Sequence, residues 1–125
     1  MKKIINTTKA PSPIGPYSQA VLAGDTLYVS GQIALDPETG KVIDESIEKE
    51  TAQVMKNLSE VLKAADMNFS NVVKTSIFLS DMDFFTKVNE VYGKYFTSDF
   101  PARETVAVRT LPKNVNVEIA VTAVK

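Results

Sequence analysis

The sequence predicts an α+β domain in which two helices cover one face of a mixed β-sheet. Two stretches carry apolar residues at helical spacing, and they separate segments that are rich in β-branched or alternating apolar residues. The segments follow one another in the order β-β-α-β-α-β-β, and the first few residues could add an N-terminal strand. A chain of 125 residues is typical of one domain, so we expect a single domain over residues 1–125.

The composition narrows the possible functions. Fourteen basic and 15 acidic residues give a net charge of −1, with no basic run that could follow a phosphate backbone, so no nucleic-acid partner is expected. The chain has no cysteine and no histidine. This excludes disulfides, thiolate nucleophiles, His-assisted triads and the usual zinc sites. Acid–base chemistry must therefore rely on carboxylates, tyrosine, lysine or water.

The N-terminal residues do not have the composition of a secretory signal peptide. Two lysines follow Met1, but residues 6–9 are polar and no apolar core comes after them. No stretch of the chain approaches the length of a membrane span. With the absence of cysteine, these features predict a cytoplasmic protein that does not enter a membrane.

The first third of the chain predicts a shaped loop followed by a hairpin. Residues 10–16 carry three prolines and one glycine, which exclude a helix or a central strand. Residues 17–23 and 26–30 read as two short strands, joined by a Gly-Asp dipeptide suited to a two-residue turn. The Asp-Pro-Glu-Thr-Gly segment at residues 36–40 predicts a further chain reversal.

A first amphipathic helix and a strand are predicted in the middle of the chain. Asp44 or Ser46 is expected to be the N-cap, because apolar residues at helical spacing begin directly afterwards. Residues 69–79 are rich in β-branched residues and predict a strand with at least one buried face. The apolar stripe of the helix comprises Ile47, Thr51, Val54, Leu58, Val61, Leu62 and Ala65.

A second helix and two closing strands follow. Ser80 and Asp83 have the spacing of a capping box, and Pro101 limits the continuation of the helix. Residues 104–109 and 115–124 predict two strands, and the Leu-Pro-Lys-Asn segment between them predicts that they form a hairpin. The stripe of the second helix comprises Phe85, Val88, Tyr92 and Tyr95 or Phe96.

Glu118 interrupts the most regular strand of the chain. Strand alternation places it on the opposite side from the apolar row that includes Val117 and Ile119. Two helices cover only one sheet face, so we expect the other face to pack against further copies of the chain in a closed ring or dimer. A carboxylate on such a face is costly unless it is paired or functional. An ordinary ion pair or a solvated side chain is the alternative interpretation.

Arg103 is the second candidate, because a guanidinium can hold a carboxylate through two parallel hydrogen bonds. A lone arginine at a strand end more often forms a surface ion pair. In the predicted hairpin Arg103 pairs near Thr122, which leaves it about four residues, or roughly 13 Å, from Glu118. One small substrate cannot span that distance. We therefore expect Arg103 of one copy to meet Glu118 of the next.

Four motifs resemble those of the RidA (YjgF) family, whose members are reactive intermediate deaminases and which is also called the L-PSP endoribonuclease family. The resemblance covers nearly the whole chain. It implies the family's chorismate-mutase-like fold and a homotrimer with one site in each cleft between subunits. The motifs are Ile14-Gly15-Pro16-Tyr17-Ser18, Ser30-Gly31-Gln32, Val88-Asn89-x-Val91-Tyr92 and the closing segment from Phe100-Pro101-Ala102-Arg103 to Glu118-Ile119.

The resemblance also implies an activity and a site. The activity is that of a 2-iminobutanoate/2-iminopropanoate deaminase, which hydrolyses imines and enamines such as 2-aminoacrylate to 2-keto acids and ammonia. Arg103 would bind the substrate carboxylate, and Glu118 would activate the attacking water. No cofactor or metal is needed, because an imine is already electrophilic. The implied substrate-binding positions are Arg103, Tyr17, Ser30, Gly31, Asn89 and Thr105.

Two positions depart from the family pattern, and two other functions stay open. Glu104 replaces a usually small or apolar residue, and alternation turns it away from Arg103, so a nearby lysine could pair with it. Thr105 stands where relatives often have cysteine, at a position that contributes mainly backbone. A non-catalytic module could bind a small carboxylate metabolite in the same cleft, where Glu118 would matter much less than Arg103. A ribonuclease is disfavoured by the lack of histidine and of a basic patch.

Overall fold

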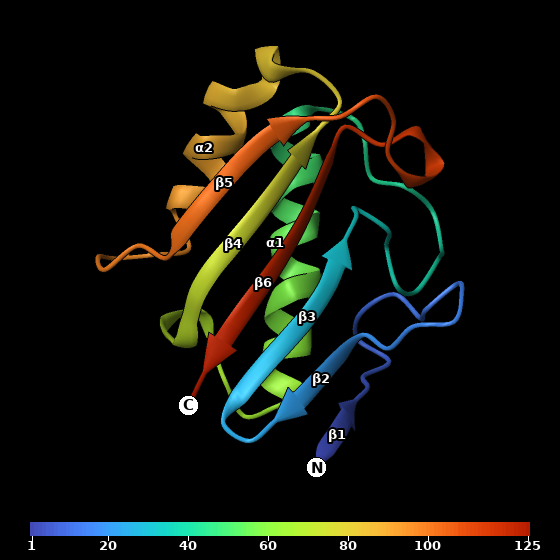
Figure 1. Cartoon of the computed structure of the whole chain (residues 1–125). Helices are drawn as coiled ribbons and strands as arrows, with labels where there is room; N and C mark the ends of the chain where they lie inside the picture. Colours follow the sequence, from blue (N-terminus) through green and yellow to red (C-terminus); the bar gives the residue numbers. More distant parts are fainter.

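Six strands form a single mixed sheet, and two helices cover one of its faces (Figure 1). The structure is a computed structural model that describes all 125 residues. The strands are β1 (Lys2–Ile5), β2 (Ala20–Ala23), β3 (Thr26–Gln32), β4 (Val72–Leu79), β5 (Ala102–Ala107) and β6 (Val117–Val124), and the helices are α1 (Ile47–Ala64) and α2 (Phe85–Gly93). Their order across the sheet is β1-β2-β3-β6-β4-β5, and only β4 and β5 are parallel neighbours. The predicted α+β class, mixed sheet and helix placement are confirmed, and β1 adds the N-terminal strand.

Helix α1 forms where the sequence predicts it. Ser46 is the N-cap, and its side chain accepts a hydrogen bond from the Lys49 backbone N–H at 3.1 Å. The helix ends at Ala64, and Asp66 follows with a positive φ of 59°. The apolar stripe packs on the inward face of the sheet, where Val54, Leu58 and the other members of the main core are buried. Burial of this stripe is the main stabilising term of the helix.

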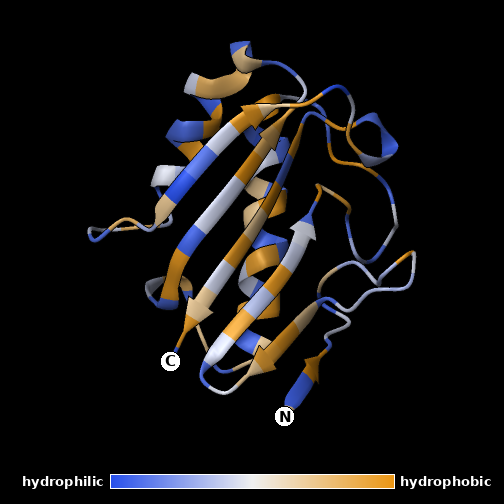
Figure 2. Ribbon diagram, in the orientation of Figure 1, coloured by the Kyte–Doolittle hydropathy of each residue, from blue (hydrophilic) through white to orange (hydrophobic).

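Strand β6 lies at the centre of the sheet and alternates as predicted. Val117, Ile119 and Val121 are buried against the helices, whereas Glu118 lies on the opposite face. Figure 2 shows this alternation as hydrophobic and more hydrophilic bands along the strand. The predicted face of Glu118 is therefore confirmed.

The predicted hairpin of the last two strands is wrong. Strand β4 lies between β5 and β6, and β5 pairs with β4 in parallel, so that Arg103 lies opposite Thr75 and not near Thr122. The reason is burial: β6 has an apolar residue at every second position and takes a central place, whereas β5 is largely exposed and takes the sheet edge. Residues 108–116 carry the chain past the end of β4 and include the 3₁₀ turn η3 (Pro112–Asn114).

The predicted capping box before α2 is also wrong. The side chain of Asp81 accepts a hydrogen bond from the Asp83 backbone N–H at 2.8 Å and begins the 3₁₀ turn η2 (Met82–Phe84), which leads directly into α2. Ser80 donates its hydroxyl to Asn116 Oδ1 at 2.9 Å instead. A long-range partner thus outcompetes the local cap.

Both predicted turns of the first third are present. In the β2–β3 hairpin Ala23 pairs with Thr26, which leaves two loop residues, and Gly24 takes the positive φ of 61° that such a turn requires. The reversal at residues 36–40 closes with a 2.8 Å hydrogen bond from the Gly40 N–H to the Asp36 carbonyl. The strand predicted at residues 69–79 begins three residues later, after the 3₁₀ turn η1 (Phe69–Asn71).

The sheet face that no helix covers is partly apolar. Ile4, Tyr28 and Val106 lie on this face with 43%, 53% and 44% of their surface exposed. An ion pair between Lys74 and Glu104 lies on the same face, with 2.6 Å between nitrogen and oxygen. The face has the mixed character of a protein interface, and its coverage by other copies stays a prediction. Neither helix is long and apolar enough to cross a membrane.

Candidate active site

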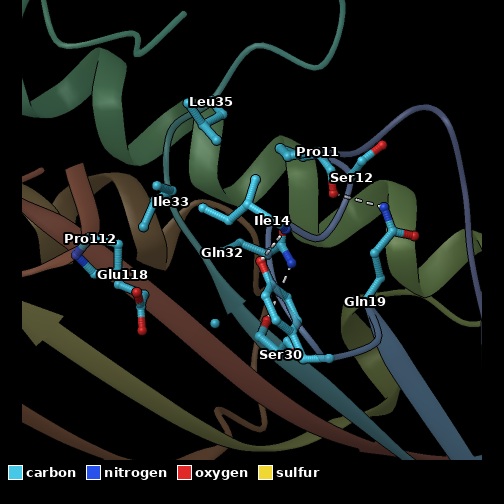
Figure 3. A pocket seen from close by; sticks show the side chains of 12 residues that line it. Pro11, Ser12, Ile14, Gln19, Ser30, Gln32, Ile33, Leu35, Pro112 and Glu118 are labelled. Carbon is cyan, nitrogen blue, oxygen red and sulfur yellow. Dashed lines mark hydrogen bonds between the residues drawn. The ribbon is translucent and has the colours of Figure 1, made fainter. Parts of the chain in front are cut away.

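Glu118 lies in a pocket of about 360 Å³ that four of the predicted site residues share. The proline-rich loop at residues 10–16, the end of β3 and the middle of the sheet enclose it, and Figure 3 shows Glu118 reaching into it from β6. Its walls are largely apolar and include Ile14, Ile33 and Leu35. The predicted residues that line it are Tyr17, Ser30, Gly31 and Glu118.

Gly31 and Glu118 are in direct contact, and the carboxyl can take its present position because residue 31 has no Cβ atom. A Cβ atom at residue 31 would lie 2.6 Å from Glu118 Oε2, which is closer than any real Cβ contact. The missing side chain lets the carboxylate lie against the backbone of β3. Tyr17, half exposed, stands on the loop side of the same pocket.

The electrostatic state of Glu118 suits proton transfer. The pKa of its carboxyl is raised above the usual range because burial removes part of its water, and no cation or hydrogen-bond donor of the chain offsets this. A carboxyl without a partner in an apolar pocket is a common arrangement of a general acid or base. Glu118 can thus exchange protons closer to neutral pH than an ordinary glutamate can.

The pocket wall is held by polar side chains, one of which the sequence reasoning missed. Gln19 is buried, accepts from the Thr7 N–H at 2.7 Å and donates to the carbonyls of Thr7 and Pro11 at 3.0 and 2.9 Å. Ser30 donates its hydroxyl to the Ser18 carbonyl at 2.6 Å. Ser30 therefore shapes the pocket through the backbone of its wall. A glutamine between small and apolar residues in a predicted strand was the signal for Gln19.

Arg103 occupies a separate groove on the helix side of the sheet edge. Its Nη1 donates to Asn89 Oδ1 at 2.8 Å, so the structure brings these two predicted residues together. Its guanidinium carbon lies 5.2 Å from the ring centre of Tyr92 and 5.8 Å from that of Phe85. The amide and the two ring faces fix the plane of the guanidinium. Phe100 and Gly93 lie at the margin of the groove.

Tyr92 connects this groove to the core. Burial raises the pKa of its phenol, although the hydrogen bond to Thr75 and the nearby charge of Arg103 act in the opposite direction. The phenol donates to Thr75 Oγ1 at 3.0 Å, inside the protein. Tyr92 is therefore a neutral support for Arg103 and is not placed to act as an acid.

The two residues that depart from the family pattern behave differently. Glu104 points away from Arg103 and pairs with Lys74 and the hydroxyl of Ser76, so the expected direction and lysine partner are confirmed. The hydrogen bonds of Lys74 and Ser76 hold the pKa of Glu104 below its usual range. Thr105, on the same side of β5 as Arg103, has a buried hydroxyl oxygen without a hydrogen-bond partner. Such an unpaired buried group is unusual, and Thr105 is not among the residues that line the groove.

Within one chain, Arg103 and Glu118 lie on opposite faces of the sheet. Arg103 is level with Thr75 and Val121 on the helix side, and Glu118 is three positions along β6 on the uncovered side. Two strand spacings across and three residues along give a separation of roughly 14 Å. A small substrate cannot touch both residues of one copy. The predicted separation holds, although the hairpin on which it was based does not exist.

The chemistry that these groups allow is limited and clear. Glu118 is the one ionisable side chain of its pocket apart from the phenol of Tyr17. Arg103 is the one ionisable side chain of its groove apart from the phenol of Tyr92. No three acidic side chains are grouped in a way that could hold a metal ion. A guanidinium can bind a small carboxylate, and an unpaired carboxyl can move protons.

Comparison with known proteins gives consistent matches over the whole chain. The family model described as Endoribonuclease L-PSP matches residues 7–125. A human protein named 2-iminobutanoate/2-iminopropanoate deaminase is 47% identical over 125 residues, which cover 100% of this chain and 91% of the human protein. Arabidopsis thaliana has a protein named Reactive Intermediate Deaminase A, chloroplastic, which is 49% identical over 118 residues and matches 94% of this chain and 63% of its own length.

Solved structures agree with the sequence matches. The crystal structure of RidA from an Antarctic Psychrobacter bacterium superimposes with a TM-score of 0.95 at 38% sequence identity. The match covers 98% of this chain and 99% of the bacterial chain. The six-stranded sheet, its strand order and the placement of both helices are therefore shared with a known fold.

Proposed function

The chain belongs to the RidA branch of the Endoribonuclease L-PSP family, and from this we propose that it is a 2-iminobutanoate/2-iminopropanoate deaminase. It hydrolyses reactive imines and enamines to 2-keto acids and ammonia. The observation that carries this function is the 47% identity to a deaminase of that name over the full length of the chain. The unpaired carboxyl of Glu118 in an apolar pocket supports the same reaction class.

Arg103 binds the substrate carboxylate in this proposal. A 2-imino acid carries its carboxylate next to the reacting carbon, and a guanidinium forms two parallel hydrogen bonds with such a group. The guanidinium donates one hydrogen bond to Asn89, and the other N–H groups of Arg103, which lines the groove, have no hydrogen-bond partner within the chain. Binding at Arg103 orients the imine carbon toward Glu118 of another copy.

Glu118 moves the protons. As a carboxylate it accepts a proton from water while the water oxygen bonds to C2 of the protonated imine (C=NH₂⁺) and the C=N π electrons move to nitrogen, which becomes a neutral NH₂ group. It then returns a proton to that nitrogen, and the C–N bond breaks with release of ammonia as the C2 oxygen forms the ketone and loses its proton to the carboxylate or to water. For an enamine, the acid form of Glu118 first protonates the β-carbon and gives the protonated imine. The raised pKa makes the carboxylate of Glu118 a stronger base, and makes its acid form more populated, than those of an ordinary glutamate at the same pH.

The complete site lies between two copies of the chain, most simply in a homotrimer. Arg103 and Glu118 of one copy face opposite sides of the sheet, so each half-site requires the other half from a neighbour. The uncovered face with Tyr28 and Val106 exposed provides a surface for the contact. Cyclic symmetry repeats the same contact and gives one site per interface.

Mixing two inactive variants tests the shared site. Arg103→Ala and Glu118→Ala proteins are unfolded together in equal amounts, refolded and assayed for keto-acid release. Random assembly gives about one intact site in four, so we expect about a quarter of the wild-type activity. The separately refolded variants are the control. A mixture that stays as inactive as its components would contradict a site shared between copies.

An assay of the single variants separates the deaminase from a binding module. 2-Aminoacrylate is generated enzymatically, and ammonia and keto-acid release are compared with the uncatalysed rate. A deaminase loses the acceleration in both Arg103→Ala and Glu118→Ala. A binding module gives no acceleration, and calorimetry with a stable keto acid would then show binding that needs Arg103 and not Glu118.

We also propose a cytoplasmic location on the basis of the composition, which includes no cysteine. The name of the Arabidopsis relative places that protein in the chloroplast, so location differs within the family. Fractionation of the source cells with antibody detection checks this assignment.

A further inference from the structure

Glu50 is a fully buried acidic side chain in the first part of α1, and the mechanism above does not use it. Its Oε2 accepts hydrogen bonds from the backbone N–H groups of Asn116 at 2.7 Å and Val117 at 3.1 Å. Its Oε1 accepts from Asn116 Nδ2 at 3.0 Å. All three donors are neutral, so no ion pair explains the presence of the carboxylate at this place.

These bonds fix the chain directly before Glu118. The Asn116 carbonyl accepts from the Ser80 N–H at 2.9 Å, and Asn116 Oδ1 accepts from the Ser80 hydroxyl at 2.9 Å. Every polar group of Asn116 is therefore bound, two of them by Glu50 and two by Ser80. These hydrogen bonds of Asn116 lie where the chain leaves η3, after two residues with positive φ, Lys113 and Asn114. They set where β6 begins.

The position of β6 matters because the carboxyl of Glu118 lies directly against Gly31 of β3. The carboxyl lies so close to Gly31 that a single added carbon would collide with it. One residue separates Glu118 from Asn116, so a displacement of Asn116 in the close-packed interior also moves the backbone at Glu118. Proton transfer requires the donor and acceptor atoms to lie within hydrogen-bond distance, so a small shift of β6 changes the rate strongly.

We propose that Glu50 is a positioning residue of the deaminase reaction, which holds the start of β6 so that Glu118 keeps its place over Gly31. This inference rests on the proposed function and deepens it. A carboxylate is suited to the task because it accepts several hydrogen bonds at once from two directions. A glutamine has a single acceptor oxygen, and its NH₂ group would face a donor. Stability alone does not call for a buried charge, since apolar side chains usually serve it as well.

The test exchanges the hydrogen-bond donor and acceptor groups between the side chains of Glu50 and Asn116. In Glu50→Gln the amide NH₂ opposes Asn116 Nδ2, and we expect kcat to fall about tenfold or more while KM changes less than about twofold, because the Arg103 groove is untouched. Asn116→Asp places two carboxylates together and should be at least as harmful. In the double variant the introduced amide can donate to the introduced carboxylate and still accept from the backbone, so kcat should return to within about threefold of wild type.

A destabilised variant elsewhere in the same helix separates positioning from stability. Val61→Ala removes buried methyl groups eleven residues further along α1 and should lower Tm without changing kcat of the folded protein. The acid limb of the pH profile should move in Glu50→Gln, because displacement changes the burial of Glu118, and should stay in place in Val61→Ala. If Glu50→Gln keeps the wild-type kcat and acid limb, or the exchange restores Tm but not kcat, Glu50 does not position Glu118.

The outcomes distinguish this inference from the proposed function. An intact protein that does not accelerate imine hydrolysis refutes the deaminase, and Glu50 then has no reaction to support. An active intact protein with an equally active Glu50→Gln variant refutes only the inference. If Glu50→Gln does not fold, Asn116→Ala replaces it, since it removes the side-chain bond and keeps the backbone bonds. A kcat equal to that of Val61→Ala would then overturn the proposal.

Discussion

In the groove beside α2, Arg103 donates to Asn89 and lies over two aromatic rings, whereas in the pocket at the end of β3 Glu118 has no such partner. The cation is held before any ligand arrives, as suits a group that only binds. The carboxyl is left unpaired, which raises its pKa and costs stability, as suits a group that must gain and lose a proton. In the proposed reaction, fixation of the Arg103 side chain would serve binding, and partial desolvation of Glu118 would serve proton transfer.

Removal of the proton-transfer group should have the largest effect. Glu118→Gln keeps the shape of the side chain but cannot accept or return a proton, so we expect kcat to fall by about 10²–10⁴ with a small change in KM. Steady-state keto-acid release with enzymatically generated imine measures it. A variant that keeps most of its kcat would give Glu118 a binding role and erase the contrast with Arg103.

Substitution of the binding group should have the next largest effect. Arg103→Lys keeps the charge but loses the parallel pair of hydrogen bonds and the fixed plane, and we expect kcat/KM to fall about 10- to 100-fold. Asn89→Ala should cause a smaller loss in the same parameter, since it frees the guanidinium without removing it. Equal kcat/KM values for Arg103→Lys and wild type would mean that charge alone is recognised.

The substitution Gly31→Ala, which adds one methyl group, should disturb the Glu118 pocket and leave the Arg103 groove unchanged. The added carbon meets the mobile end of Glu118, so the carboxyl swings away; we expect about a tenfold loss of kcat and about 1 kcal/mol lower stability. In a Glu118→Ala background the same methyl group should cost almost no stability, because its obstacle is gone. Denaturant unfolding of the wild type, the two single variants and the double variant measures this coupling. Additive changes in the free energy of unfolding would show that the contact is absent.

The pH dependence should reveal the raised pKa of Glu118. A general base must be ionised, so kcat/KM should fall about tenfold per pH unit below the free-enzyme pKa, which lies above the ordinary glutamate value of about 4.3. Ionisation in the pocket opposes folding, so the contribution of the protonated group to stability is present at low pH and is lost as pH rises through the raised pKa. Glu118→Gln should thus gain stability relative to wild type at neutral pH, which thermal unfolding at several pH values checks.

The smallest effect is expected at Glu104, beside Arg103 in sequence but on the other sheet face. Its partners are Lys74 and Ser76, and both carboxylate and ammonium are about half exposed. Glu104→Ala should change the activity less than about twofold. A large loss would mean that the uncovered face and the Arg103 groove are coupled.

The elements were predictable because their signals are local. The apolar stripe of α1, the cap at Ser46 and the alternation around Glu118 each lie within a few residues, and all three are present. Strand pairing is not local: nothing near residues 108–116 indicates that β4 will separate β5 from β6. Any two consecutive strands with a turn between them suggest a hairpin, and only the competition for the central position decides otherwise.

The main residues of the candidate site were predictable from the sequence, whereas the groups that hold them in place were less so. Glu118 and Arg103 stood out as charges in strands, but which groups hold them depends on contacts between distant segments. Glu50 had a readable signal, since it lies three residues after Ile47 and four before Val54, within the apolar stripe. Thr105 had none, because an unpaired hydroxyl becomes visible only when its surroundings are known.

The hydrogen bonds of Gln19 have a consequence for the timing of catalysis. They tie residues 7–11 to the sheet, so the wall of the Glu118 pocket is in place before a ligand arrives. An imine hydrolyses spontaneously in water, so an enzyme that acts on it must bind it before that reaction takes place. A receptor that must first fold around its ligand binds it in fewer encounters, whereas one that is already shaped binds it in a larger share of them. Rigidity here determines how much of a short-lived compound is captured.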